Sequence, residues 1–308
     1  IYTKLDKTPS IENVSQNLLD WKFEEQIFEY QGHKMSYHDS GDKSKKVIVL
    51  LHGYPTSSYD WHLIWSELNT EYRLIAMDML GFGFSDKPDS IDYTISLQTD
   101  ILEALLKNLN IEKVNLIAHD YGDNVAQELL ARNIEQKEGY PLKIESLTLL
   151  NGGLFPETHR PTTIQKLLSS PIGGTVASFT NQTLFSKSFS KVFGPNTQPN
   201  NQELIDQWYV ICHQKGYKIA DKLTHASDDR EKNRERWVGA LVSPNVPILY
   251  ISGQLDPVTG IETVERYLEL VPNPNVIKLD SIGHFPQLEN PKDVLSKVNA
   301  HIRKTEEL

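Results

Sequence analysis

Short apolar runs recur along most of this chain, and they favour a parallel β-sheet. Strands buried on both faces give continuous apolar runs, because neither face of such a strand meets water. Five runs of this kind, and a weaker sixth at the end, cover residues 46–53, 72–80, 113–120, 144–153, 246–253 and 275–284. Before them, two partly alternating runs flank Gly32 and predict an antiparallel hairpin.

Helical patterns separate the predicted strands. Isoleucine and leucine recur near helical spacing within residues 94–111, and further helical patterns cover 124–136, 262–271 and 292–304. Alternation of strand and helix is typical of an open sheet with helices on both of its faces. The fold class that we predict is therefore α/β, with a mostly parallel central sheet.

The alternation is interrupted once, between residues 154 and 240. This stretch shows no clear strand signal, is punctuated by proline and glycine, and contains short helical patterns such as residues 201–216. A long segment of this kind inside an α/β fold is often a lid. We therefore predict a core formed by residues 1–153 and 241–308, with residues 154–240 as a helical cap.

Charge and composition narrow the class of partner. The 308 residues include 31 basic and 41 acidic side chains, a net charge of −10. This balance disfavours nucleic acid and anionic membrane surfaces, which need concentrated positive charge. The densest charged stretch, residues 228–236, mixes both signs and is most simply a solvated helix face. The oligomeric state cannot be inferred from the sequence.

Cysteine and metal motifs add little. Cys212 is the only cysteine, and the chain has no CxxC or HExxH spacing, so we expect neither a metal nor another cofactor. The first residues lack the apolar core of a signal peptide, and no apolar stretch approaches the ~18 residues of a membrane span. We expect a cytoplasmic protein. Because the chain starts at Ile1, the possibility of a trimmed leader or anchor stays open.

Polar residues stand just beyond the ends of several predicted strands, where sites form in parallel sheets. His52 and Gly53 follow the first strand, Asp120 the third, Asp256 the fifth and His284 the sixth. Carboxylate, second acid and histidine thus appear in the chain order of the α/β-hydrolase fold, with aspartate replacing serine. The small residues two positions to either side of Asp120 would let the strand turn sharply into a helix.

Each signal has a simpler explanation when taken alone. Asp120 could be a helix N-cap, because its side-chain oxygen can accept a backbone N–H bond. Asp256 could be a turn residue before Pro257, and His284 a polar surface residue. Four matches in one order at strand ends favour a site over these separate explanations.

The motifs also resemble a known family. From about residue 25 to 303 the chain is similar to the α/β-hydrolase superfamily, in the haloalkane dehalogenase and epoxide hydrolase branch. The resemblance is strongest to the family of mesoderm-specific transcript proteins. It rests on HGYPTSSYDW, DMLGFGFSDKP, HDYGDNVAQELL, NGGLFPETHRP, RWVGAL and LDP, which lie in both core and cap. Some relatives carry their second acid where this chain has Asn151; asparagine is neutral and cannot compensate an imidazolium, which favours Asp256.

An aspartate in this position suits displacement at saturated carbon. An ionised carboxylate needs no base, and it can form an alkyl ester on Asp120. His284 would then activate water, with Asp256 orienting the imidazole. By resemblance, the oxyanion donors are the backbone N–H groups of Tyr54 and Tyr121. One such donor is worth about 3 kcal/mol in other enzymes.

The leaving group is the open question. Resemblance to dehalogenases implies halide donors, typically a Trp after the nucleophile and an Asn after His-Gly, but Tyr121 and Tyr54 stand there. Fluoroacetate dehalogenases have an Arg after the nucleophile, which is also absent. Epoxide hydrolases use cap tyrosines, because a protonated phenol can donate to the epoxide oxygen. The candidate substrate-binding residues in the cap are therefore Tyr209, Trp208, Trp237 and Tyr217, although aromatic residues in cap helices mostly pack.

Two neighbours of Asp120 are interpreted as supporting residues. Asp123 lies in the first helical turn, where the macrodipole favours a carboxylate, although it could instead tune Asp120 by repulsion. His119 is expected to support the site through hydrogen bonds.

Three hypotheses of function follow. The first is a hydrolase that opens an epoxide to a diol, acting on a small apolar organic substrate and water. The second is a haloalkane dehalogenase with unusual halide donors. The third is a hydrolase-like protein that binds a ligand or partner without turnover, which a complete set of Asp120, His284 and Asp256 disfavours.

Overall fold

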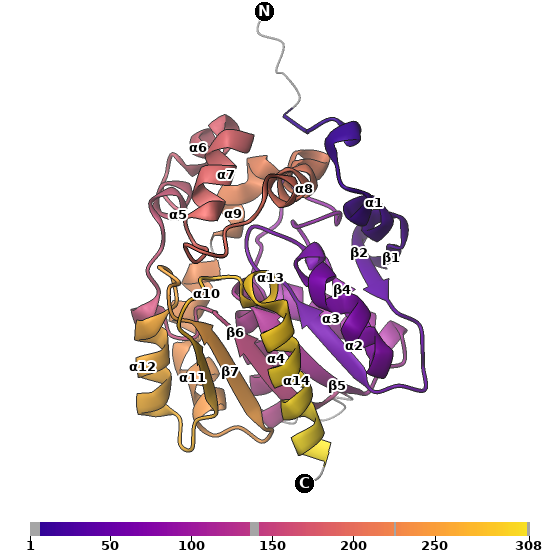
Figure 1. Ribbon diagram of the computed structural model, residues 1–308, viewed down its shortest axis with the longest axis vertical. Helices are drawn as coiled ribbons and strands as arrows, with labels where there is room; N and C mark the ends of the chain where they lie inside the picture. The colour runs from indigo at the N-terminus through magenta and orange to yellow at the C-terminus, as the bar shows by residue number, and fades with distance from the viewer. Residues whose placement is uncertain (1–6, 136–141, 225, 307–308) are drawn as a thin grey trace, which may run out of the picture.

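The computed structural model describes residues 7–135, 142–224 and 226–306. Its centre is an eight-stranded sheet in the order β1-β2-β4-β3-β5-β6-β7-β8 (Figure 1). The strands are β1 (Gln26–Tyr30), β2 (His33–Asp39), β3 (Val47–Leu51), β4 (Arg73–Met77), β5 (Lys113–His119), β6 (Lys143–Leu150), β7 (Ile248–Gly253) and β8 (Val276–Leu279). β1 and β2 form the expected antiparallel hairpin, β2 pairs antiparallel with β4, and the remaining pairs are parallel. The α/β class and the mostly parallel sheet are confirmed.

Helices cover both faces of the sheet and gather beyond one end of it. They are α1 (Gln16–Phe23), α2 (His62–Glu71), α3 (Ile95–Asn108), α4 (Tyr121–Glu135), α5 (Thr163–Leu168), α6 (Gly173–Phe179), α7 (Gln182–Ser190), α8 (Asn201–Cys212), α9 (Ala220–Leu223), α10 (Ala226–Lys232), α11 (Arg234–Val242), α12 (Ile261–Leu270), α13 (Pro286–Glu289) and α14 (Pro291–Glu306). No helix in the described ranges is long and apolar enough to cross a membrane.

The two faces of the sheet explain the continuous apolar runs. In β3, Ile48 and Leu50 pack with α2 and α14, whereas Val49 and Leu51 pack with α3 and α4. Successive strand side chains point to opposite faces, so a strand covered on both sides is apolar at most of its positions. The few polar side chains within the strands are buried, such as Asn115 and Ser146, which bond each other. Polar side chains that can form a site therefore collect at the strand ends.

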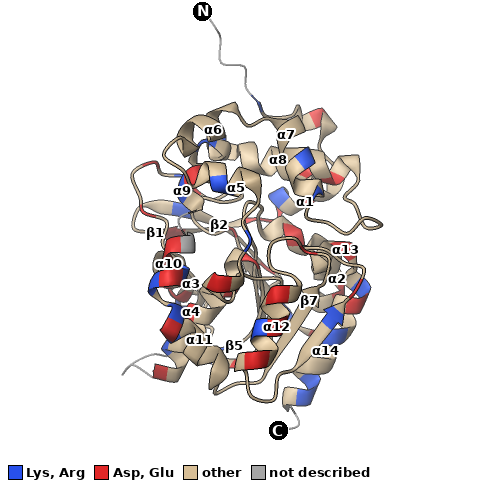
Figure 2. Ribbon diagram, turned by 90° about the vertical axis from the view of Figure 1, so that its left-hand side faces the viewer, with Lys and Arg blue, Asp and Glu red and all other residues tan. Residues whose placement is uncertain are grey.

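The cap is formed by α5 to α9, which gather beyond one end of the sheet (Figure 1). It has an aromatic cluster of its own, in which Phe185, Phe189 and Trp208 pack together. Acidic and basic residues are interspersed over both cap and core (Figure 2).

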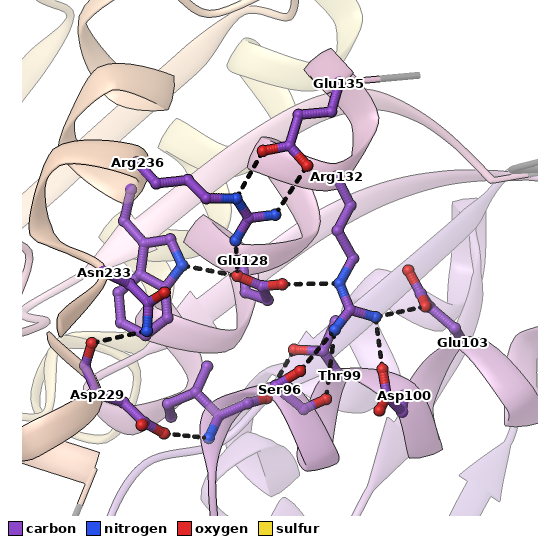
Figure 3. A network of polar contacts seen from close by, with 12 residues as sticks. Ser96, Thr99, Asp100, Glu103, Glu128, Arg132, Glu135, Asp229, Asn233 and Arg236 are labelled. Carbon is purple, nitrogen blue, oxygen red and sulfur yellow. Dashed lines mark hydrogen bonds and ion pairs between the residues drawn. The ribbon is translucent and has the colours of Figure 1, made fainter. Parts of the chain in front are cut away.

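The last part of the predicted cap lies in the core. α11 packs beside α4, and its residues Trp237, Val238 and Leu241 belong to the main hydrophobic core. Residues 234–240 therefore pack against α4 of the core, although the sequence assigned them to the cap. A group of polar contacts around Glu128 joins α11 to α4 and α3 (Figure 3).

Candidate active site

Asp120 occupies a sharp turn between β5 and α4. Its φ of 49° is in the left-handed region, and its carboxylate is 8% exposed. The turn is possible because the chain crosses β3 closely at Gly122. A Cβ on residue 122 would lie 2.8 Å from the carbonyl oxygen of His52 and nearer still to that of Leu51. A glycine two residues after Asp120 is therefore a requirement of the turn, as the sequence motif indicates.

Asp120, His284 and Asp256 meet at the carboxyl ends of β5, β7 and β8. His284 Nδ1 lies 2.8 Å from Asp256 Oδ2, and its Nε2 lies 3.7 Å from Asp120 Oδ1. All three side chains are buried. The three residues predicted from strand ends thus form one constellation, with the imidazole between two carboxylates.

Asp256 is held by hydrogen bonds that the sequence did not reveal. Its Oδ2 accepts from Asn151 Nδ2 over 2.8 Å and from Thr259 Oγ1 over 2.6 Å, and its Oδ1 accepts from the N–H of Val258. Burial disfavours the charged carboxylate, but His284 and these donors lower the pKa of Asp256 to about 2. Asp256 is therefore ionised, and Asn151, at the end of β6, supports the acid.

The charge on His284 follows from its neighbours. Burial alone would favour a neutral imidazole, but Asp256 and then Asp120 outweigh it and raise the pKa of His284 to about 9. At neutral pH the resting site therefore holds an imidazolium between two carboxylates.

The loop that carries His284 is fastened to the cap and to α13. The backbone N–H of His284 donates to the carbonyl of Val192, and Phe285 stacks on Phe193 of the cap with ring centroids 5.0 Å apart. Glu289 accepts from the N–H groups on both sides of His284, those of Gly283 and Phe285. The loop thus has one fixed path, and cap and core share it.

One of the two predicted oxyanion donors is in contact with Asp120. The N–H of Tyr54 donates to Asp120 Oδ2 over 2.9 Å. Gly53 permits this approach, because a Cβ there would lie 2.7 Å from the Cβ of Asp120. Tyr121 begins α4 and lines the same cavity, and the role of its N–H stays a prediction.

The two supporting residues differ from each other. His119 Nε2 bonds the carbonyl of His284 over 2.8 Å, and burial, together with the charge of His284, lowers its pKa well below the usual value. His119 is therefore a neutral donor that helps position His284. Asp123 is fully buried, and burial together with Asp120 raises its pKa well above the usual range. A neutral Asp123 gains little from the helix macrodipole, which was the preferred explanation for it.

A cavity of about 330 Å³ opens in front of Asp120. Most of its lining residues have polar side chains, although apolar atoms form the larger part of the exposed wall, and cap and core both contribute. The lining residues are Tyr54, Asp120, Tyr121, Asn124, His159, Pro161, Gln165, Lys166, Ser169, Leu223, Thr224 and Arg230.

The four cap residues predicted to bind substrate are not on this wall. Trp208 is buried in the cap, where its Nε1 donates to the carbonyl of Lys7, and Tyr217 stacks on its ring. Tyr209 packs against the cluster that holds Trp21. Trp237 donates from Nε1 to Glu128 over 2.7 Å and fastens α11 to α4 (Figure 3). These aromatic residues pack, which is the alternative that the sequence left open.

Sequence reasoning missed the cavity residues of the cap. Arg230 belongs to the mixed-charge stretch 228–236, which was interpreted as a solvated helix face, yet its side chain lines the cavity. His159 also lines it and accepts from Arg230 Nη1 over 3.2 Å. Neither residue carries a sequence signal, because only the path of the cap chain directs them inward. Within the described ranges no cluster of histidine, cysteine and acidic residues could hold a metal.

Residues 46–291 match the family described as alpha/beta hydrolase fold, and the chain belongs to that family. It is similar to the mesoderm-specific transcript protein of Mus musculus, with 45% identity over 295 residues that cover 92% of this chain and 87% of that relative. It is also 27% identical over 299 residues to a cis-3-alkyl-4-alkyloxetan-2-one decarboxylase of Shewanella oneidensis, covering 93% of this chain and 90% of the relative. The resemblance inferred from the motifs is confirmed.

Solved structures show the same fold. The haloalkane dehalogenase DatA from Agrobacterium tumefaciens C58 matches with a TM-score of 0.73 at 22% identity, over 91% of this chain and 96% of that chain. The epoxide hydrolase CorEH matches with a TM-score of 0.74 at 20% identity, over 91% and 98%. Because enzymes with different leaving groups match equally well, the fold does not decide between them.

Proposed function

We propose that this hydrolase uses Asp120 as a nucleophile toward saturated carbon and opens an epoxide to a diol. The observation that carries the proposal is the position of the Asp120 carboxylate. The carboxylate faces the cavity, one of its oxygens accepts the N–H of Tyr54, and the other lies 3.7 Å from His284 Nε2. A serine at this turn would need the histidine as a base, whereas a carboxylate is already a nucleophile.

The reaction has two steps. An Asp120 oxygen attacks an epoxide carbon, and the carbon–oxygen bond of the ring breaks. The departing oxygen takes the proton of the Tyr54 phenol, which recovers one from the His284 imidazolium, so that a hydroxyalkyl ester on Asp120 faces a neutral imidazole. A water oxygen then attacks the carboxyl carbon of that ester while His284 takes the water proton. The negative charge develops on an Asp120 oxygen, where the N–H of Tyr54 is already placed. On collapse the ester carbon–oxygen bond breaks, and the departing alcohol oxygen takes the proton from His284. The diol leaves, and the carboxyl group of Asp120 returns its proton to the imidazole, which restores the resting charges.

Formation of the ester lowers the pKa of His284 between the two steps, and this favours the second step. In the resting protein both Asp120 and Asp256 favour the imidazolium of His284. Esterification removes the charge of Asp120, so the pKa of His284 in the ester falls below its resting value of about 9. The imidazole thus becomes available as a base at the point where water has to be activated.

An oxygen leaving group agrees better with this cavity than a halide does. Tyr54 and Tyr121 line the wall at the two positions where the dehalogenase resemblance implies halide donors. Burial raises the pKa of the Tyr54 phenol above the usual value, so it stays protonated and can donate to an epoxide oxygen. The Tyr121 hydroxyl is buried away from the cavity and does not serve this role. The decarboxylase relative is named for an oxetan-2-one, which also contains a small oxygen-bearing ring.

The test is to trap the ester. His284→Gln should be exposed to a mixed set of styrene oxide, 1,2-epoxyhexane and 1-bromobutane, followed by mass spectrometry of the peptide that contains Asp120. We expect an adduct with the mass of an epoxide on Asp120, and none on Asp120→Asn. A single turnover of wild-type protein in ¹⁸O-labelled water should place the label in Asp120. Label that enters the diol directly would overturn the mechanism, and an adduct from the bromide alone would overturn the epoxide assignment.

A further inference from the structure

The cavity in front of Asp120 carries more positive than negative side chains. Arg230 from α10 and Lys166 from α5 both line it, whereas Asp120 is its one acidic residue among those on the described wall. An apolar substrate gains nothing from two cations at its site. The charges of the wall therefore bear on what the substrate looks like.

Arg230 differs from the other arginines of the neighbouring segment. Arg234 bonds Glu157, and Arg236 bonds both Glu128 and Glu135. Arg230, in contrast, forms no ion pair with any carboxylate of the described residues, and its side-chain contact is the neutral ring of His159. Arg230 is half-buried, and a guanidinium that is partly removed from water without an ion-pair partner costs free energy, so the protein gains from an anion supplied by a ligand.

The guanidinium is also held in place. Gly153 leaves room for it at the end of β6, since a Cβ there would collide with Nη1. Arg230 Nη1 can only donate, so the Nδ1 of His159 accepts and the ring proton of His159 is on Nε2. Burial and the charge of Arg230 lower the pKa of His159 to about 3, which keeps the ring neutral.

The helix that carries Arg230 is fastened to the core. The carboxylate of the preceding residue, Asp229, accepts the N–H of Ile95 over 2.8 Å at the start of α3, and Asn233 donates back to the carbonyl of Asp229 (Figure 3). Arg230 is thus presented by a fixed turn of helix, as a specific binding group needs to be.

We infer that Arg230 binds a carboxylate group of the substrate, at the wall of the cavity where His159 holds one of its nitrogens. The inference rests on the proposed function, since it assumes that the cavity in front of Asp120 receives the substrate. A planar guanidinium fork matches a carboxylate and can bind both of its oxygens. The substrate is then an acid that carries the electrophilic carbon and a carboxylate at separate positions, and not the purely apolar molecule expected from the sequence.

Binding of unreactive probes tests the inference without any turnover. Calorimetric titration of full-length Asp120→Asn protein with hexanoate, hexanamide and hexan-1-ol compares an anion with two neutral molecules of similar length. We expect hexanoate to bind at least tenfold more tightly than the neutral probes. Arg230→Gln in the same background should weaken hexanoate at least tenfold and leave hexanamide within twofold.

Two further variants control for charge and folding. Arg234→Gln removes an arginine four residues away that bonds exposed Glu157, and hexanoate affinity should stay within twofold of the parent. Arg230→Lys keeps a positive charge, and should recover part of the affinity lost in Arg230→Gln. Equal affinity for hexanoate and hexanamide in the Asp120→Asn parent would overturn the inference, as would unchanged hexanoate binding in Arg230→Gln.

The failure of this inference is distinguishable from failure of the proposed function. Hexanoate is not an electrophile, so its binding tests the anion site and not the nucleophile. Conversely, an ester on Asp120 formed from a neutral epoxide supports the nucleophile whatever Arg230 binds. Hexanoate selectivity without any ester would keep the anion site and overturn the nucleophile, and the reverse result would do the opposite.

Discussion

Arginines on neighbouring helices have opposite surroundings in two regions of this protein. Around Glu128, Arg132 and Arg236 are paired with several carboxylates, and Trp237 adds an indole N–H (Figure 3). In the cavity, Arg230 faces His159 and has no ion pair with a described carboxylate. The comparison separates two uses of charge. Charges that are paired within the chain fix helices to one another, whereas a charge left without an anion is available to a ligand.

The largest effect is expected at Asp120, the proposed nucleophile. Asp120→Asn removes the nucleophile but keeps the shape of the side chain. We expect the rate of ester formation to fall by roughly 10⁴-fold or more, with thermal stability close to that of wild type. Single-turnover kinetics with the epoxide identified by trapping would measure the fall. A variant with rates within tenfold of wild type would mean that another group attacks the substrate.

Breaking the paired group should destabilise the fold. Glu128→Ala leaves Arg132, Arg236 and the Trp237 indole without their shared carboxylate. Both arginines keep other carboxylate partners, so the cost is that of the charge-assisted hydrogen bonds to one buried carboxylate, about 1.5–3 kcal/mol. Urea denaturation should show a loss of this size in the free energy of unfolding, while substrate KM stays near that of wild type. A change in KM with unchanged stability would contradict the assignment of this group to folding.

His284 should make stability depend on pH. Its folded pKa of about 9 is above the unfolded value of about 6.5, so folding is stabilised by the bound proton. The stabilisation is fully present below pH 6.5 and is lost as pH rises through 9; its size is about 3 kcal/mol. Denaturation curves between pH 6 and 10 should show this loss in wild type and not in His284→Gln. Identical pH profiles would mean that the imidazole is not held between two carboxylates.

The smallest effect is expected on the free energy of unfolding of Arg230→Met. The Arg230 side chain is partly buried and forms no ion pair with a described carboxylate. Its removal should therefore change the free energy of unfolding by less than about 1 kcal/mol, in either direction. The same measurement on Glu128→Ala gives the contrast. A loss of several kcal/mol in Arg230→Met would show that Arg230 holds the fold together and would remove the basis for separating the two groups.

The core was predictable from the sequence, and the cap wall was not. Sites in parallel sheets form at the carboxyl ends of the strands, so Asp120, Asp256 and His284 could be placed together from their positions after the strands. Asn151 bonds Asp256, and Glu289 bonds the backbone beside His284. These contacts depend on how the loops fold, and no sequence motif predicts them. In the cap, short helices are joined by irregular segments, and a shift of one residue in a helix turns a side chain from the cavity to the interior.

The prediction that aromatic residues of the cap bind the substrate relied on residue type alone. Trp237 and Tyr217 have the chemistry of pocket residues, but large apolar rings also fill the interior between helices, and here that use prevails. Arg230 was overlooked for the opposite reason. A charged residue within a mixed stretch is usually solvated, whereas the side chain of Arg230 lies beside Gly153 and lines the cavity.

The attachment of Phe285 to the cap constrains how anything reaches the cavity. Because Phe285 stacks on Phe193 and the N–H of His284 bonds Val192, lifting this side of the cap would pull the imidazole from its two carboxylates. We therefore expect the entrance to the cavity to lie between α5 and α10, away from the loop that carries His284. Molecules would enter and leave there, while the contacts of Phe285 and His284 with the cap stay intact throughout the reaction.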